Sequence, residues 1–422
     1  MIRDHWKQLS RILLAVAFYF GSGLALVGQD LPHYEVVDLG TLGGTVSEGF
    51  GVNRFSIVAG TSSTTNDNFV HAFLWVAGKM IDLHNLPGGS TSGAAGVNLF
   101  GQVAGESDNA NTDPNAFLCF TPNECRAFLW QAGKMQDLGV LRKGHNSSAG
   151  WINNVGVVVG ASETTTEIDP ANGFPPVHAT AWILGRAIDL GTLGGPVSLA
   201  NSNNDIGQVT GISQFDQKIN PNTGIPTFHA FLFDRSRMVD LSANGGLGGS
   251  QSEGISINNS QAIVGDADLG GDQSYHAFVW RNGTMRDLGT IGNDPFSSAG
   301  SINDSGEIVG WSGDGISIFR ATVWSGNAGT DLNTLVSPLT DLYLLEATGV
   351  NARGEITGLG VSQSTGEVHA FLLLPQCNSN ANTVVKNVDG SSPAVARAEV
   401  RVDRSQGFGR MLRARRLRSQ IR

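Results

Sequence analysis

The sequence predicts an all-β protein and, within that class, a seven-bladed β-propeller with four strands in each blade. Three observations support this prediction. Glycine provides 56 of the 422 residues, which favours turns and disfavours helix interiors. A pattern of about 50 residues recurs along the chain, as in propellers and other repeat folds. The two ends of the repeated region also complement each other, because one end has a strand that the other lacks.

Three landmarks recur in the same order, seven times each. The first is Asp-Leu, often continued as Gly-Thr-Leu-Gly-Gly, and it begins at Asp38, Asp82, Asp137, Asp189, Asp240, Asp287 and Asp331. The second is an Asn seven residues before a Gly, found at Asn53, Asn98, Asn153, Asn204, Asn258, Asn303 and Asn351. The third is His-Ala-Phe-Leu-Trp or a variant, which begins at His71, Arg126, His178, His229, His276, Arg320 and His369.

Each copy of the repeat predicts four short strands. The first strand ends at the Asn, and a tight turn, Asn-x-x-Gly in most copies, leads into the second. His-Ala-Phe-Leu-Trp is the third strand, and the stretch that ends in Asp-Leu is the fourth. In the fifth copy these last two strands are joined by Asn282-Gly283, a strong hairpin signal. This hairpin places Phe278 opposite Asp287, with His276 diagonal to the same carboxylate.

We therefore predict that His276 and Asp287 form a structural pair, and that the pair is repeated around the molecule. A carboxylate between packed sheets needs a partner. Arg126 and Arg320 replace the His in two copies, and an arginine would still donate to the carboxylate but could not ligate a metal. The aromatic residue that ends the third strand, Trp in five copies, is expected to pack between blades.

The ends of the repeated region predict how the ring closes. The seventh copy stops after residues 369–374 without a fourth strand, whereas the region begins with an isolated strand at residues 34–39. Pairing the two would let the N-terminal strand complete the last blade and would protect two sheet edges. A β-solenoid of the same repeats is the alternative, but it leaves the isolated strand unexplained.

The ordered motifs Asp-Leu-Gly-Thr-Leu-Gly-Gly, Ile-Asn-x-x-Gly-x-Val-Val-Gly and His-Ala-Phe-Leu-Trp resemble the HAF family of extracellular bacterial repeats. The resemblance covers about residues 34–375. It implies export and a repeat architecture. It implies no activity and supplies no catalytic residues.

Residues 1–30 predict a secretory signal peptide ahead of the repeated region at residues 31–376. Arg3, Lys7 and Arg11 precede an apolar run that is shorter than the roughly 20 residues needed to span a bilayer. An uncleaved membrane anchor is the alternative. We therefore expect the repeated region to be secreted, either extracellular or periplasmic.

The net charge of −10 conceals two regions of opposite sign. Residues 377–422 contain nine arginines and one lysine against three acidic residues, a net charge of +7, whereas residues 31–376 carry −18. The basic tail is predicted to be disordered, or alternatively to form a cationic helix that contacts an anionic surface. The acidic body argues against a nucleic-acid partner.

Only three cysteines are present. Cys119 and Cys125 lie six residues apart around a turn-rich segment, which predicts a local disulfide in an oxidising compartment, with two free thiols as the alternative. Cys377 is left over.

Motifs that carry catalytic chemistry are sparse. The sequence has no G-x-S-x-G, P-loop or H-E-x-x-H pattern. Asp266, Asp268 and Asp272 are a weak candidate for a calcium loop, and no other cofactor is expected.

The loops between the second and third strands differ in length. They span 21, 18 and 18 residues in copies two to four, against 10 or 11 in the other copies. Candidate ligand-binding residues in these loops combine hydrogen-bond acceptors with aromatic rings: Asp108, Asp113, Phe117, Phe120, Glu167, Asp169, Phe174, Phe215 and Asp216. This combination suits a glycan or a protein ligand, and tolerated insertions without function are the alternative.

We therefore expect a monomeric, non-catalytic binding or scaffolding protein whose partner is an extracellular polysaccharide or another surface protein. A residue type that recurs in every blade is a poor catalytic candidate, because one active site needs one constellation. Two alternatives remain: an extracellular carbohydrate-active enzyme, either a glycosidase or a lyase, and a purely structural surface protein.

Overall fold

A computed structural model describes residues 31–376 apart from 114, 116, 117, 120, 171 and 327. The predicted signal peptide, the basic tail, Cys377, Phe117 and Phe120 lie outside the described residues. The described chain contains 28 strands, two short 3₁₀ helices and no α-helix, which confirms the all-β class. No helix in this part of the chain is long and apolar enough to cross a membrane.

The strands form antiparallel groups of four in chain order, which we call units 1 to 7. Units 1 to 3 contain β2 (Gly43–Val52), β3 (Val58–Thr64), β4 (Val70–Val76), β5 (Lys79–Asp82), β6 (Ser92–Val97), β7 (Val103–Thr112), β8 (Asn123–Gln131), β9 (Lys134–Asp137), β10 (Ser147–Ile152), β11 (Val158–Glu163), β12 (Val177–Ile183) and β13 (Arg186–Asp189). Units 4 to 6 contain β14 (Ser198–Asn203), β15 (Val209–Ile219), β16 (Pro226–Asp234), β17 (Arg237–Asp240), β18 (Gly248–Ile257), β19 (Ile263–Leu269), β20 (Tyr275–Arg281), β21 (Thr284–Gly289), β22 (Phe296–Ile302), β23 (Ile308–Gly313), β24 (Phe319–Ser325) and β25 (Ala328–Asp331).

Unit 7 is assembled from both ends of the described chain. It contains β26 (Leu342–Val350), β27 (Ile356–Ser362) and β28 (Val368–Pro375), and β1 (Tyr34–Asp38) pairs antiparallel with β28. The register runs from Tyr34 opposite Pro375 to Asp38 opposite Phe371. The 3₁₀ helices η1 (Thr65–Asp67) and η2 (Leu332–Thr334) follow β3 and β25.

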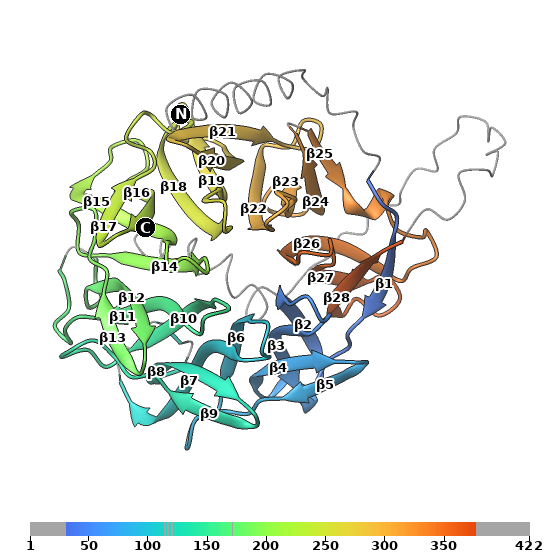
Figure 1. Cartoon of the computed structure of the whole chain (residues 1–422), viewed down its shortest axis with the longest axis horizontal. Coiled ribbons are helices and arrows are strands. Elements are labelled where there is room, and N and C mark those ends of the chain that lie inside the picture. Colours follow the sequence, from blue (N-terminus) through green and yellow to red (C-terminus); the bar gives the residue numbers. More distant parts are fainter. Residues whose placement is uncertain are drawn as a thin grey trace, which may run out of the picture. The chain divides into compact units, whose positions relative to one another are not determined.

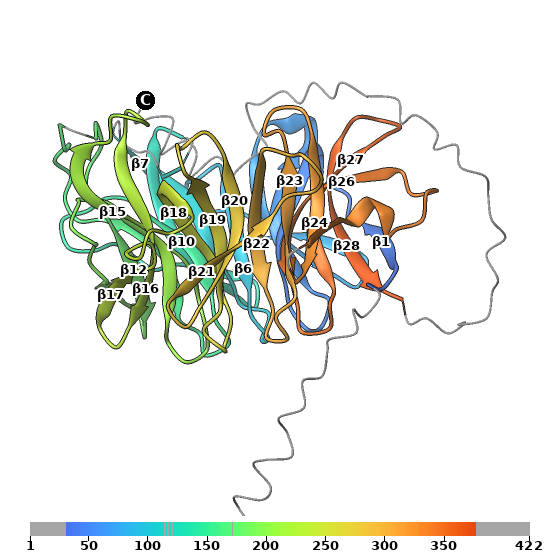
Figure 2. The ribbon, with the colours of Figure 1, turned by 90° about the horizontal axis from the view of Figure 1, so that it is seen from above.

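The units succeed one another around a central axis, with the first strand of each unit on the inside and the last on the outside (Figure 1). This is the arrangement of a β-propeller. Figure 2 shows the strands from the side. The turns after the first and third strands lie at one end, which we call the turn face. The loops after the second strands and the connections between units lie at the other end, which we call the loop face.

The predicted hairpin register is present in unit 5. Phe278 lies opposite Asp287, and β20 turns into β21 through Asn282 and Gly283. These two residues have φ values of 51° and 83°, the left-handed conformation that a two-residue type I′ turn requires.

The recurring Gly of the second strand is explained by a close backbone approach. In unit 5 a Cβ added to Gly265 would lie 1.9 Å from the carbonyl oxygen of Glu253 on β18, next to a bulge in that strand. The equivalent glycines of all the other units meet the first strand at 1.9 or 2.0 Å. No side chain fits at this position, so Gly is required there.

The seven recurring Asn side chains form a closed cycle of hydrogen bonds on the turn face. Each Nδ2 donates to the backbone oxygen of the equivalent Asn in the next unit: Asn53 to Asn98 at 2.9 Å, Asn98 to Asn153 at 3.2 Å, Asn153 to Asn204 at 2.9 Å, Asn204 to Asn258 at 3.1 Å, Asn258 to Asn303 at 3.0 Å, Asn303 to Asn351 at 2.9 Å and Asn351 to Asn53 at 2.8 Å. Each Oδ1 accepts from amides of its own turn, such as those of Ser260 and Ala262 for Asn258. One side chain therefore shapes the turn and joins two units.

Buried serines fix the connections between units, a role that the sequence analysis did not anticipate. Ser297 Oγ accepts from the amide of Ala277 in the preceding unit at 2.9 Å and donates to the carbonyl oxygen of Gly289 at 2.8 Å. Ser312 Oγ accepts from the amide of Ile291 at 2.9 Å. Both serines are fully buried.

The core is divided into apolar clusters between neighbouring units. One cluster packs Leu232 and Leu241 of unit 4 against Ile263, Phe278 and Trp280 of unit 5. Trp280 is 8% exposed. The recurring Trp position therefore contributes to packing between sheets here, as expected from the sequence.

Candidate functional site

The recurring His and Asp side chains form pairs on the loop face. The His Nδ1 to Asp Oδ2 distances are 2.9 Å for His71 and Asp82, 2.9 Å for His178 and Asp189, 2.8 Å for His229 and Asp240, 2.9 Å for His276 and Asp287, and 2.9 Å for His369 and Asp38. In unit 5 Asp287 Oδ1 also accepts from the amide of Gly289 at 2.6 Å. Burial would raise the pKa of Asp287, but the hydrogen bonds from His276 and Gly289 hold it below its usual value.

The two arginine-containing units differ from this expectation. Arg126 makes its close contact with Glu124 at 2.6 Å, and its Nε lies 3.9 Å from Asp137. Arg320 bonds to Asp294 and not to Asp331, whose carboxylate instead accepts from the amide of Asn333. The guanidinium is longer than an imidazole and therefore reaches past the Asp of its own hairpin.

We expect the His276 and Asp287 substitutions to alanine to be non-additive. The pair is partly exposed, with side-chain exposures of 18% and 42%, so the expected coupling free energy is only about 0.5–1 kcal/mol. Urea unfolding of both single variants and the double variant measures it. His276→Ala combined with Asp189→Ala, from another unit, should be additive. Additive losses for His276 and Asp287 themselves would contradict the structural pair.

The long segments of units 2 and 4 consist largely of extended strands. β7 and β8 continue outward from the sheet, as do β15 and β16, whereas unit 3 has a loop between β11 and β12. The repeat predicts loops for all three segments, because their residues lie outside it, and the structure corrects this prediction for units 2 and 4.

The acidic candidates in the segment of unit 2 point inward. Asp108 is fully buried, and its carboxylate accepts from the amides of Ser90 and Thr91 at 2.7 and 2.8 Å. Asp113 accepts from Asn146 Nδ2 at 2.7 Å. These side chains brace the connections between units and do not present their oxygens to solvent.

A second brace joins units 2 and 3 through Asn146, which is fully buried. Besides its bond to Asp113, Asn146 Nδ2 donates to Glu163 Oε1 at 2.8 Å, and Asn146 Oδ1 accepts from the amide of Cys125 at 2.8 Å. Burial raises the pKa of Glu163 against the opposing effect of these bonds. Cys125 is also joined to Cys119 by a disulfide with an S–S distance of 2.09 Å.

The candidates of units 3 and 4 divide into buried and exposed groups. Phe174 packs with Val197, Ile212 and Phe228 in a buried cluster, and Asp169 closes its own turn through Asn172. Glu167 is exposed, and Asp216 is half-buried. Phe215 is 45% exposed, with its ring 5.2 Å from that of His229.

The structure does not collect the calcium candidates into one cluster. Asp266 accepts from Ser298 Oγ at 2.8 Å, and Asp272 accepts from the amide of Ser250 at 2.7 Å. The ligand atoms of Asp266, Asp268 and Asp272 do not form a set within 4.8 Å of one another.

Glu346 on β26 is a carboxyl group that the sequence analysis missed. It is half-buried, and burial raises the pKa of its side chain to about 7. In each first strand, one residue lies opposite the recurring Gly of the second strand. Glu346 comes directly before that residue in unit 7, and Glu48 and Glu253 take the same position in units 1 and 5.

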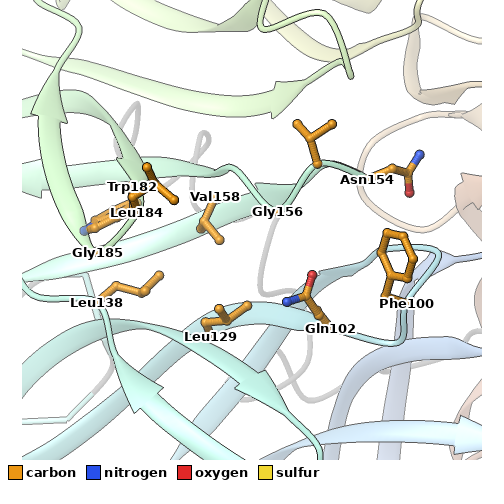
Figure 3. A pocket seen from close by; sticks show the side chains of 11 residues that line it. Phe100, Gln102, Leu129, Leu138, Asn154, Gly156, Val158, Trp182, Leu184 and Gly185 are labelled. Carbon is orange, nitrogen blue, oxygen red and sulfur yellow. The ribbon is translucent and has the colours of Figure 1, made fainter.

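A cavity of about 310 Å³ lies on the turn face between units 2 and 3 (Figure 3). Its walls are mainly apolar and include Phe100, Leu129, Val155, Trp182 and Leu184. Phe100 and Val155 are 75% and 67% exposed. Sequence reasoning missed this cavity, although its two exposed apolar residues stand at the same place in the Asn-x-x-Gly turns of neighbouring units.

Comparisons with known proteins add little. No protein-family model and no curated protein sequence matches the chain. The structure is similar to a gluconolactonase from Xanthomonas campestris, at 11% identity and a TM-score of 0.36, over 83% of this chain and 96% of that one. It is also similar to the acylaminoacyl peptidase of Pyrococcus horikoshii, at 10% identity and a TM-score of 0.41, over 77% of this chain and 50% of that one. The β-propeller domain of the Trilobed protease from Pyrococcus furiosus gives 10% identity and a TM-score of 0.33, over 71% of this chain and 98% of that one. Scores this low carry no argument about activity.

Proposed function

We propose that this chain is a secreted, non-catalytic binding or scaffolding protein, built as a seven-bladed propeller whose last blade is completed by β1. The pairing of β1 with β28 supports this closure, and so does the cycle of Asn hydrogen bonds that returns from Asn351 to Asn53. The recurring His, Asp, Asn and Ser side chains bond to one another or to the backbone, which suits a scaffold.

The proposed binding role rests on one observation: the long segments of units 3 and 4 expose apolar side chains to solvent. Ile168, Phe215 and Ile219 are 47%, 45% and 54% exposed. Rigid loops that expose aromatic and aliphatic groups beside acceptors such as Glu167 suit a glycan or a protein ligand. We therefore place the ligand surface on the loop face of these units.

The test substitutes Ile168, Phe215 and Ile219 together by serine in the full-length protein. Substitution leaves the turn of Asp169 and the buried cluster around Phe174 in place, whereas shortening the segments would remove them. Exposed positions tolerate such changes within about 0.5 kcal/mol each. We expect retention on immobilised neutral polysaccharides, or capture of surface proteins by crosslinking, to fall at least about tenfold because the contact area is lost.

The matched control is the double variant Phe100→Ser and Val155→Ser, which removes exposed apolar groups from the turn face. Its binding should equal that of the unmodified protein. If the control variant loses binding and the loop variant keeps it, the ligand surface lies at the turn-face cavity instead. Absence of any retained polysaccharide or protein would favour the purely structural alternative.

A carbohydrate-active enzyme is the second candidate, and Glu346 is the observation that favours it. A carboxyl group with a pKa of about 7 suits a general acid at neutral pH. The release of reducing ends from the same polysaccharides, abolished by Glu346→Gln, would support this alternative against the binding role.

A further inference from the structure

We propose that His71, Asp82 and His84 form a binding site for a zinc-type divalent metal ion on the loop face of unit 1. His84 is the residue that distinguishes this unit. In units 2, 3 and 5, and at the connection that follows β1, the equivalent residue is Gly, with φ values between 68° and 77°. His84 adopts φ 58° at this position, a left-handed conformation that disfavours a residue with a side chain.

The backbone of this turn does not require a histidine. The amide of His84 donates to Asp82 Oδ1 at 2.7 Å, just as the amide of Gly40 donates to Asp38 at 2.8 Å. Histidine therefore adds strain without adding a turn hydrogen bond. What it adds is a second imidazole beside a carboxylate that already contacts His71.

The geometry of the three donors approaches that of a metal site. Asp82 Oδ2 lies 2.9 Å from His71 Nδ1 and 3.4 Å from His84 Nδ1, and ligand atoms of all three residues lie within 4.8 Å of one another. Ligand atoms around tetrahedral zinc are about 3.3 Å apart, given bond lengths near 2.0–2.1 Å. The His84 side chain is 78% exposed and can rotate to close the remaining gap. In the described part of the chain, no other group of His, Cys, Asp and Glu brings three such donors together.

Asn85 supplies an independent observation. Its Nδ2 lies 3.1 Å from His71 Nε2, while its Oδ1 is buried without a hydrogen-bond partner. Rotation of the amide by half a turn would let Oδ1 accept from Nε2–H, which leaves the Nδ1 lone pair of His71 for a metal. A histidine ligand usually donates its other ring N–H to such an acceptor. The ligated state therefore gives a hydrogen-bond partner to this oxygen, which has none in its present orientation.

Asn85 is also a departure from the repeat. Gly40-Thr41, Gly191-Thr192 and Gly289-Thr290 occupy the equivalent places, so His84 and Asn85 both depart from this dipeptide. Two imidazoles and one carboxylate favour zinc over calcium, which prefers oxygen ligands. Water would complete the coordination on the exposed side.

The experiment titrates zinc chloride alone into metal-free full-length protein by isothermal calorimetry. We expect one zinc ion to bind per chain. The variant His84→Gly with Asn85→Thr restores the dipeptide of three other connections, so it should fold, and its circular dichroism and unfolding midpoint verify this. We expect this variant to lose the site, with at least about a hundredfold weaker zinc binding because one ligand and the positioning amide are absent.

Asn85→Thr alone separates positioning from ligation. It should keep a stoichiometry of one and weaken affinity by about 10- to 100-fold, as expected for a residue that orients a ligand. Unchanged zinc binding by the folded His84→Gly and Asn85→Thr double variant would overturn the proposal, as would an absence of zinc binding by the unmodified protein. Neither result bears on the ligand surface of units 3 and 4.

Discussion

Gly265→Ala is expected to lower the free energy of unfolding by about 3 kcal/mol or more. The new Cβ would lie 1.9 Å from the carbonyl oxygen of Glu253. Both atoms belong to backbones that are held in the ladder between β18 and β19, so neither can move without breaking strand pairing. Urea unfolding of the full-length protein measures the loss.

Gly283→Ala is the matched control. Gly283 has φ 83°, and a Cβ added there would meet no atom within 4 Å beyond its chain neighbours, so this substitution incurs only the conformational penalty of about 1 kcal/mol. Equal losses at the two glycines would mean that β18 yields to the new methyl group and that the close approach does not explain the recurring Gly.

Asn258→Ala should cost about 3 kcal/mol, the second large effect. The side chain is 5% exposed, and its removal leaves the amides of Ser260 and Ala262 without their acceptor. It also removes one of two donors from the carbonyl oxygen of Asn303, which still accepts from the amide of Gly306. Each buried polar group left unsatisfied costs about 1–3 kcal/mol, although some of these groups will recruit water. Urea unfolding again gives the measurement.

Two further variants separate the contributions to this loss of stability. Asn258→Asp keeps the acceptor for the turn but replaces the donor to Asn303 with an oxygen, so it isolates the bond between units. Asn222→Ala removes an exposed amide and should change stability by less than about 0.5 kcal/mol. An Asn258→Asp variant as stable as the unmodified protein would show that the cycle on the turn face adds nothing to stability.

The sequence was most informative where a pattern has only one structural solution. Asn282-Gly283 between two alternating segments allows one hairpin register, and the register with Phe278 opposite Asp287 follows from it. The neighbouring position of His276 and Asp287 then follows from strand geometry alone. Periodicity and turn chemistry are local, so they can be read before any three-dimensional contact is known.

Contacts between distant segments could not be read in the same way. The recurring Asn marks a tight turn in the sequence, and the Oδ1 of Asn258 bonds to amides of that turn. Its Nδ2, however, reaches Asn303, which is 45 positions away in the sequence. Asp108 was expected at a ligand surface because it is charged and lies between strands, whereas it is buried under the connection at Ser90 and Thr91. These partners lie 18 and 17 residues earlier in the chain, and no local rule identifies them.

The candidate metal site was missed for a different reason. His71 and Asp82 belong to the repeat, and recurrence argued for a structural role. The signal was the departure from the repeat at His84 and Asn85, which could have been found by asking where each copy differs from the others. A repeat protein therefore shows its scaffold in what recurs and its individual chemistry in what does not.

The sheet of unit 7 also has a consequence for the time course of biosynthesis. His369 and Asp38 are 331 residues apart in the sequence, yet they pair across β28 and β1. A growing chain can complete units 1 to 6 in order, but β1 has no partner until β28 has been synthesised. Contacts of such long sequence separation form slowly. Unit 7 should therefore be the last sheet to assemble, and until then the nascent chain carries an open strand edge that a chaperone or a second chain can pair with.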